Sequence, residues 1–185
     1  MIPEELIAQI VRCLDDKNIP YMIIGGQAVL LYGRPRLTRD IDITLGVDSD
    51  RFEIIARVCK DIGLKILPVE PAAFAAQTKV LPAEDPDSKM RVDFVFSFTP
   101  YEQQALKRVK KVELAGYPVC FASCEDVIIH KMLAGRAVDE EDIRSILVKN
   151  RSKIDLGYVR KWLGQFEGLQ EYADVLKKFK KLVGS

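Results

Sequence analysis

Residues 21–45 read YMIIGGQAVLLYGRPRLTRDIDITL, and the order of apolar runs and chain breakers in this segment predicts the core of the fold. Tyr21–Ile24 is short and wholly apolar, which is typical of a buried strand. Gly25 and Gly26 end that strand and lead into an apolar helix. Asp40–Leu45 then alternates polar and apolar residues, as a half-buried strand does. The segment therefore predicts a strand, a glycine turn, a helix and a second strand.

The regions outside this segment differ in character. Up to residue 122, helical patterns alternate with strand patterns, of which the alternating run over 90–98 is the clearest. We therefore expect an α/β (α+β) fold, a mixed β-sheet flanked by helices with an all-helical C-terminal portion. The expected domains are a core over 1–122 and a C-terminal helical subdomain over 123–185. The helical patterns of that subdomain cover 124–134, 140–148, 156–163 and 169–182.

Composition narrows the classes of function. The 185 residues carry 28 Lys and Arg against 27 Asp and Glu, so the overall charge does not attract nucleic acid or anionic membranes. The sequence contains no apolar run of the roughly 20 residues that span a bilayer, and it does not open with a basic and apolar leader. We expect a cytoplasmic protein with no membrane partner. One histidine and four cysteines without paired spacing argue against a zinc site.

Two of the predicted strands carry acidic side chains on one face. Alternation along Asp40–Leu45 sends Asp40 and Asp42 to the same side, and alternation along 90–98 sends Asp93 to the polar side. If the two strands lie near one another, the three carboxylates repel each other unless a cation neutralises them. Oxygen ligands of this kind suit Mg²⁺ or Mn²⁺. The alternative for Asp93 is an ordinary solvated position on an amphipathic strand.

The glycine pair supplies a second element of a site. A strand that ends in glycines and leads into a helix lets backbone N–H groups hold phosphate oxygens. A Gly-Gly turn also serves many tight connections that bind nothing. The combination of Gly25 and Gly26 with the downstream Asp40 and Asp42 is what favours a phosphate and metal site.

This combination resembles the signature of the polymerase-β-type nucleotidyltransferases, which is an apolar strand, Gly-Gly or Gly-Ser, and Asp-x-Asp or Asp-x-Glu. The run over 33–39 is similar to the Arg-x-Thr-x-Asp run of the AbiEii-like branch, which includes toxins of bacterial toxin–antitoxin systems. The resemblance extends to about residue 147. The residues that match the Lys…Arg-x-x-Asp-x-x-Asp pattern of that branch are Lys131, Arg136, Asp139 and Asp142.

The resemblance implies a metal-dependent nucleotidyltransferase that moves a nucleoside monophosphate from an NTP, such as ATP, to an acceptor hydroxyl and releases pyrophosphate. It implies a nucleotidyltransferase catalytic core over 1–122, with Mg²⁺ or Mn²⁺ as the cofactor. The implied catalytic and metal-binding residues are Asp40, Asp42 and Asp93. The implied nucleotide-binding residues are Gly25, Gly26, Arg39 and Lys131.

Several alternatives remain open from the sequence. The acceptor is tRNA or a protein if the toxin branch is right, and that branch implies an antitoxin partner. The rivals are a small-molecule transferase of the antibiotic-modifying type and a non-catalytic nucleotide-binding or regulatory module of the same fold. Lys131 is equally compatible with a surface position, and Arg136, Asp139 and Asp142 with an internal salt-bridge network.

Overall fold

The computed structural model describes residues 2–184, which form two compact units. The first unit contains the chain up to Gln27 together with Thr38–Ala122. The second contains Ala28–Leu37 and the chain from Ser123 onward. The expected α/β fold with an all-helical C-terminal portion is confirmed. The division into domains at residue 122 stays a prediction.

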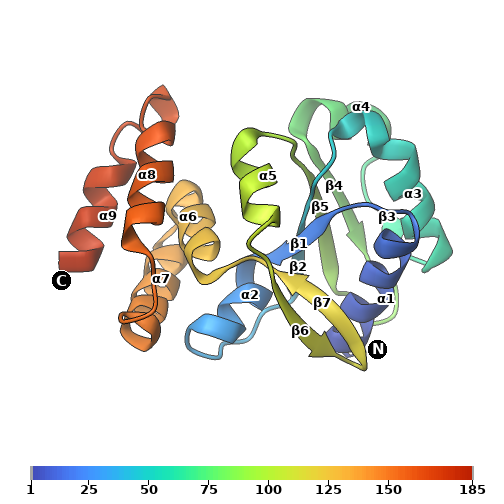
Figure 1. Cartoon of the computed structure of the whole chain (residues 1–185). Coiled ribbons are helices and arrows are strands. Elements are labelled where there is room, and N and C mark those ends of the chain that lie inside the picture. The colour runs from blue at the N-terminus through green and yellow to red at the C-terminus, as the bar shows by residue number, and fades with distance from the viewer. Residues whose placement is uncertain (1, 185) are drawn as a thin grey trace. The chain divides into compact units, whose positions relative to one another are not determined.

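The helices and strands follow the apolar periodicity of the sequence (Figure 1). In chain order, the α-helices of the described residues are α1 (Pro3–Asp16), α2 (Gly25–Tyr32), α3 (Phe52–Asp61), α4 (Pro71–Thr78), α5 (Pro100–Leu106), α6 (Cys124–Ala134), α7 (Ala137–Asn150), α8 (Leu156–Phe166) and α9 (Val175–Gly184). The strands are β1 (Tyr21–Ile24), β2 (Asp40–Leu45), β3 (Lys65–Ile66), β4 (Val80–Glu84), β5 (Arg91–Phe96), β6 (Lys110–Leu114) and β7 (Tyr117–Phe121). Two short 3₁₀ turns are η1 (Ser49–Arg51) and η2 (Gln170–Tyr172).

The strands of the first unit form one mixed sheet of seven strands within the described residues, in the order β3-β4-β5-β2-β1-β7-β6. The central strands β2 and β5 run parallel, and β1 pairs antiparallel with β2. Alternation along β2 and β5 buries one face completely, as at Ile41, Ile43 and Phe94. Helices α1 and α3 lie side by side in this unit (Figure 1). The polar residues of β2 and β5 are left on the other face.

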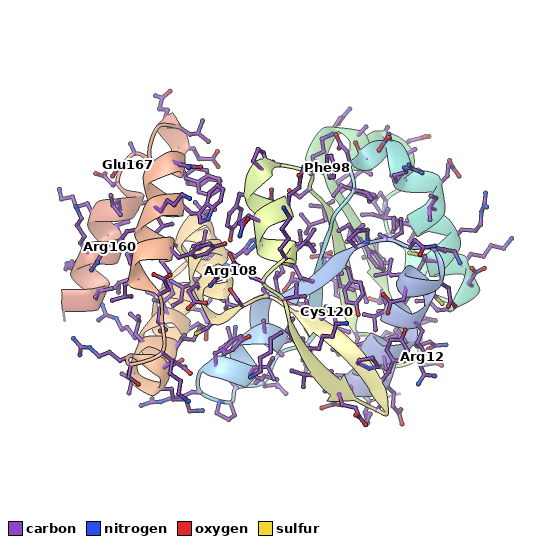
Figure 2. The ribbon with its side chains drawn as sticks, in the orientation of Figure 1. Arg12, Phe98, Arg108, Cys120, Arg160 and Glu167 are labelled. Atoms are coloured by element: carbon purple, nitrogen blue, oxygen red, sulfur yellow. The ribbon has the colours of Figure 1, made fainter. Side chains whose placement is uncertain are left out.

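Helix α1 is fastened to the hairpin strand β7 by polar and aromatic contacts. Arg12, labelled in Figure 2, lies 4.8 Å from the centre of the Tyr117 ring. The Tyr117 hydroxyl donates to Asp15 Oδ2 over 2.8 Å. The backbone N–H of Cys120, also labelled in Figure 2, donates to the Tyr21 hydroxyl over 3.3 Å. These contacts join helix α1 to strand β7, and strand β7 to strand β1.

In the second unit, helix α6 has the boundaries that the sequence predicts. The Ser123 hydroxyl accepts from the backbone N–H of Asp126 over 3.2 Å and caps the helix. Gly135 ends it in the left-handed conformation at φ of +63°. The Tyr158 hydroxyl donates to Asp126 Oδ1 over 2.9 Å and joins α8 to α6. Side chains such as Leu163 are fully buried among these helices.

Two sequence-based expectations about local structure are wrong. The turn-forming residues over 82–88 predict a polar loop, but the loop starts later, because Pro82 belongs to β4 and its carbonyl accepts from the backbone N–H of Leu67 over 3.1 Å. The expected single helix over 169–182 is broken into η2 and α9. At the break, the Tyr172 ring packs edge-on against Phe166 with centroids 6.0 Å apart.

Among residues 2–184, no helix is both long enough and apolar enough to cross a membrane. The expectation of a cytoplasmic location stays a prediction.

Candidate functional site

The candidate site is built on the paired strands β2 and β5 of the first unit. The parallel register sets Asp42 directly opposite Asp93. Asp40 lies two residues earlier on β2 and shares the face of Asp42, because side chains alternate along a strand. Asp40 is exposed, whereas Asp42 and Asp93 are half-buried. The strand register thus gives all three carboxylates one face of the sheet.

The glycine turn meets β2 beside Asp42. Ile24, the last residue of β1, is the antiparallel partner of Asp42. Gly25 follows at φ of +64°, a conformation that glycine adopts without strain. A Cβ atom at residue 25 would lie only 2.7 Å from Asp42 Cγ, closer than carbon atoms approach. Because glycine has no side chain, the Asp42 carboxyl group can lie directly beside the first residue of α2.

Thr38 and Gln27 fix the start of β2 by binding the same backbone oxygen. The Thr38 hydroxyl donates to the carbonyl of Asp40 over 3.4 Å, and Gln27 Nε2 donates to it over 3.5 Å. A Cβ atom at Gly26 would overlap the Thr38 hydroxyl, so this glycine also permits a close approach. The sequence pattern assigned neither polar residue a role. Thr38 was detectable through its place in the Arg-x-Thr-x-Asp run, and Gln27 had no comparable signal.

Arg91 brings positive charge into the carboxylate face. Its Nε donates to Asp93 Oδ1 over 3.0 Å, and the strand register sets it opposite Asp40. The hydrogen bond to Asp93 raises the pKa of the Arg91 guanidinium, and the charges of Asp93, Asp40 and Asp42 add to the rise. The Arg91 side chain is 52% exposed. Its ion pair with Asp93 is therefore open to exchange with another cation.

The donor set suits a hard divalent cation. Asp40, Asp42 and Asp93 offer carboxylate oxygens, the ligands that Mg²⁺ and Mn²⁺ prefer. Among the residues that the structure describes, no three acidic, histidine or cysteine side chains stand together in an arrangement that could hold a metal ion. In this structure the Asp93 carboxylate is paired with Arg91. A bound cation would have to draw the three side chains together.

The motif residues of the second unit form a buried ion-pair network. Lys131 on α6 donates to Asp139 Oδ1 over 2.6 Å and lies 2.9 Å from Asp142 Oδ2, both on α7. Arg136 Nε donates to Asp139 Oδ2 over 2.7 Å. Arg36 binds Asp142 through two parallel hydrogen bonds of 2.9 Å. The side chains of Lys131 and Asp139 are 4% and 0% exposed, so the centre of the network is closed to solvent.

The two aspartates of this network are held in the charged form. Burial alone would raise the pKa of the Asp139 carboxyl, but hydrogen bonds from Arg136 and Lys131 outweigh it and lower the pKa. Burial likewise opposes ionisation of Asp142, and hydrogen bonds from Arg36 and Lys131 again lower its pKa below the ordinary value. The salt-bridge interpretation of Arg136, Asp139 and Asp142 therefore describes their contacts within the second unit.

The residues predicted to bind nucleotide occupy different environments. Gly25 and Gly26 begin helix α2, where backbone N–H groups are available to an anion. Arg39 is exposed and directly precedes β2. Lys131 is buried in the ion-pair network, so the surface alternative for this lysine is wrong. The roles of these four residues as nucleotide contacts stay predictions.

A family model described as "Nucleotidyltransferase of unknown function (DUF6036)" matches residues 4–181, nearly the whole chain. None of the curated proteins compared with the chain matches it. The family match confirms the general resemblance to nucleotidyltransferases, and the AbiEii-like branch stays a prediction.

Several solved structures have the same fold. ANT(2")-Ia in complex with adenylyl-2"-tobramycin aligns with a TM-score of 0.59 and 17% identity over 95% of this chain and 98% of that chain. An antigenic nucleotidyltransferase-like protein from Paracoccidioides brasiliensis aligns with a TM-score of 0.57 and 19% identity over 94% and 91%. The lincosamide antibiotic adenylyltransferase LnuA, solved with lincomycin bound, aligns with a TM-score of 0.54 and 18% identity over 79% and 96%. At these identities the likeness establishes the fold alone.

Proposed function

The chain belongs to the DUF6036 family of nucleotidyltransferases, and from that membership we propose that it transfers a nucleoside monophosphate from an NTP to an acceptor hydroxyl group. Asp40, Asp42 and Asp93 would hold Mg²⁺ or Mn²⁺, which would supply positive charge to the phosphates and to the departing pyrophosphate. The observation that carries this proposal is the parallel register of Asp42 and Asp93, with the Asp42 carboxyl group against Gly25.

The proposed reaction is a single in-line displacement. The acceptor oxygen forms a bond to the α-phosphorus of the NTP while the bond from that phosphorus to the pyrophosphate oxygen breaks. The proton of the acceptor hydroxyl passes to a carboxylate, and we assign this role to Asp93. Asp93 is half-buried, and its partner Arg91 is exposed enough to move away. A carboxylate oxygen of Asp93 would then be available to accept the proton.

The nucleotide phosphates are the proposed ligands of the glycine turn. Backbone N–H groups of Gly25 and Gly26 bind phosphate oxygens, since the start of α2 is a favourable end for an anion. The family resemblance adds Arg39, whose exposed guanidinium directly precedes β2. It also adds Lys131, two of whose three ammonium hydrogens face Asp139 and Asp142. A phosphate would reach Lys131 only if these buried ion pairs opened.

We further propose that the chain belongs to the AbiEii-like branch of the nucleotidyltransferases. The support is that Lys131, Arg136, Asp139 and Asp142, the four residues of the branch pattern, form one contact network. The proposal then extends to a tRNA or protein acceptor and to a toxin role with an antitoxin partner. Induced expression in a bacterial host tests the toxin role. Growth arrest by the wild type and normal growth with Asp42→Asn are expected, and equal growth of both strains would contradict it.

A small-molecule acceptor is the second candidate. It is favoured by the fold shared with the antibiotic-resistance factor ANT(2")-Ia and with the lincosamide antibiotic adenylyltransferase LnuA, whose chains align over 98% and 96% of their lengths. One assay separates the two candidates. The protein is incubated with each α-³²P-labelled NTP, Mg²⁺ and either total tRNA, purified proteins or a panel of hydroxylated antibiotics. The labelled product identifies the acceptor class.

The same assay tests the function itself. Asp42→Asn and Asp93→Asn should each remove label transfer, because one carboxylate of the metal and proton-transfer set is neutralised. A matched control is Asp61→Asn, which neutralises an exposed aspartate on α3 that pairs with Lys17. Label transfer that survives both site substitutions would refute the proposed chemistry. An equal loss of label transfer in the control Asp61→Asn would also refute it.

A further inference from the structure

A groove in the second unit lies between the loop before Thr38 and helix α7. Its volume is about 640 Å³. Four cationic side chains line it against two acidic ones, and both walls belong to the second unit. The charged residues of the lining are Arg34, Arg36, Arg144, Lys149, Glu141 and Asp142.

The walls of this groove are fastened together by specific contacts. Lys149 Nζ donates to the backbone oxygen of Gly33 over 2.6 Å, and the backbone N–H of Arg34 donates to the Ser145 hydroxyl over 3.2 Å. A Cβ atom at Gly33 would lie 2.5 Å from the Ser145 hydroxyl oxygen, so the loop runs directly against α7. The double hydrogen bond from Arg36 to Asp142 of α7 completes the attachment. The cations are therefore held on a fixed frame.

The buried network sets the charge of the groove. Asp142 is one of the two acidic residues of the lining, and it is neutralised by both Arg36 and Lys131. Burying such ion pairs costs desolvation energy that their attraction often fails to recover, so the intact network adds little net stability, although removal of one partner would leave a buried charge unpaired. Its effect is to hold the Arg36 guanidinium in one place, with the side chain still 34% exposed. With Asp142 neutralised, Glu141 is the remaining acidic residue of the lining, and the groove carries net positive charge.

The groove also offers apolar surface beside the cations. Val148 is 83% exposed, and it lines the groove together with Pro35. A folded duplex presents phosphates but hides its base faces, whereas a single strand presents both. Arginine guanidinium groups bind phosphate and also stack on bases.

We propose that this groove binds a single-stranded polynucleotide, whose phosphates contact Arg34, Arg144 and Lys149 and whose bases contact Val148 and Pro35. The proposal is independent of the transfer chemistry on β2 and β5. A chain that lacks transfer activity, such as Asp42→Asn, is therefore expected to keep this binding.

Fluorescence anisotropy with a labelled single strand of about 12 nucleotides tests the proposal between about 50 and 200 mM salt, with RNA and DNA probes of the same sequence. The groove variant carries Arg34→Gln, Arg144→Gln and Lys149→Gln. The matched control removes the same charge from exposed lysines of α9 as Lys177→Gln, Lys180→Gln and Lys181→Gln. We expect the groove variant to weaken binding by about tenfold or more and to reduce the salt slope by roughly 0.7 for each lost phosphate contact, with less than about a twofold change in the control.

A preference for RNA or for DNA would identify the polynucleotide, and equal binding would assign the groove to both. Absence of binding by the wild type, equal losses in the groove and control variants, or unchanged binding by the groove variant would each overturn the proposal. Competition by poly-glutamate as strong as competition by RNA at equal charge would also overturn it, because the groove would then recognise charge without phosphate or base contacts. Binding that persists in Asp42→Asn while label transfer is lost separates this test from that of the transfer function.

Discussion

Aspartates lie in two different environments in the two units. On β2 and β5, Asp42 and Asp93 are half-buried, and the cation bonded to Asp93, Arg91, is itself half exposed. In the second unit, Asp139 and Asp142 are buried and contact three cations between them. The ion pair of Asp93 in the first unit is partly open to solvent, whereas the ion pairs of Asp139 and Asp142 in the second unit are buried.

We therefore expect the aspartates of β2 and β5 to affect metal binding and the aspartates of the buried network to affect stability. A carboxylate in a solvent-exposed ion pair can exchange its partner for a metal ion, whereas a carboxylate in a buried network cannot do so without leaving a buried charge unpaired. Replacing an aspartate with asparagine should therefore change a different measured quantity in each region. Loss of a carboxylate on β2 or β5 should reduce activity with little change in stability, and loss of a charge in the buried network should reduce stability first.

The largest expected effect is on catalysis at Asp93. Asp93→Asn should lower the rate of label transfer by about 10³-fold or more, which corresponds to about 4 kcal/mol of transition-state stabilisation. Its loss of a partly exposed pair with Arg91 should change the free energy of unfolding by about 1 kcal/mol or less. Rate assays and urea unfolding of the same preparation check both values. A drop in stability that matches the drop in rate would remove the distinction between the two regions.

The next largest effect is on stability at Lys131. Lys131→Met should lower the free energy of unfolding by about 3 to 5 kcal/mol, because it leaves buried Asp139 and Asp142 without their shared partner. Urea unfolding measures the change. Lys177→Met on the exposed face of α9 is the control and should change stability by about 0.5 kcal/mol or less. Equal stability of both variants would mean that the network does not hold the second unit together.

The third prediction concerns the glycine that brings the two parts of the site together. Gly25→Ala should reduce label transfer strongly and cost about 1 to 3 kcal/mol of stability, because the new Cβ atom displaces the Asp42 carboxyl group and strains the backbone. Gly63→Ala is the control, since Gly63 has φ of +76° but an added Cβ atom there would meet no neighbouring atom within 4 Å. The two variants should share the strain, and only Gly25→Ala should lose transfer. Equal label transfer by Gly25→Ala and Gly63→Ala would contradict the claim that the close approach of Gly25 to Asp42 matters for activity.

The network also predicts a dependence of stability on pH. The pKa values of Asp139 and Asp142 are lower in the folded state than the ordinary value of 3.8, so their ionisation stabilises the folded state above that value. This contribution should be lost as the pH falls below 3.8 through the lower folded-state pKa values. Urea unfolding from about pH 7 to about pH 2 measures it. A double variant with Asp139→Asn and Asp142→Asn should show a flatter profile, and an identical slope would contradict the assignment.

The smallest expected effect is on metal affinity at Arg91. Arg91→Gln should tighten Mn²⁺ binding by about threefold, because the guanidinium no longer competes for Asp93 or repels the ion. Isothermal titration of Mn²⁺ measures the change. Arg57→Gln removes an equal charge from the exposed side of α3 and should leave the affinity unchanged. Weaker binding by Arg91→Gln would show that Arg91 supports the metal site.

The sequence was informative wherever a pattern had a local cause. The apolar run of β1 and the alternation of β2 predicted both strands with the bounds that the structure has, because burial dictates the residue type at each position. The pairing of β2 with β5 required a contact between distant segments, and sequence alternation fixes the face of Asp93 but not its neighbour. The position of Lys131 depends in the same way on the folding of α6 against α7. Pro82 misled the interpretation of β4, because proline signals turns locally yet can accept a hydrogen bond in a strand.

The central claim is that residues 40, 42 and 93 bind one divalent cation together. Electron paramagnetic resonance of Mn²⁺ titrated into the wild type, Asp42→Asn and Asp93→Asn measures this directly, without any acceptor or turnover. We expect the wild type to bind Mn²⁺, with affinity lowered about tenfold or more in each variant and unchanged in Asp61→Asn. Equal Mn²⁺ affinity in all four proteins would contradict the account.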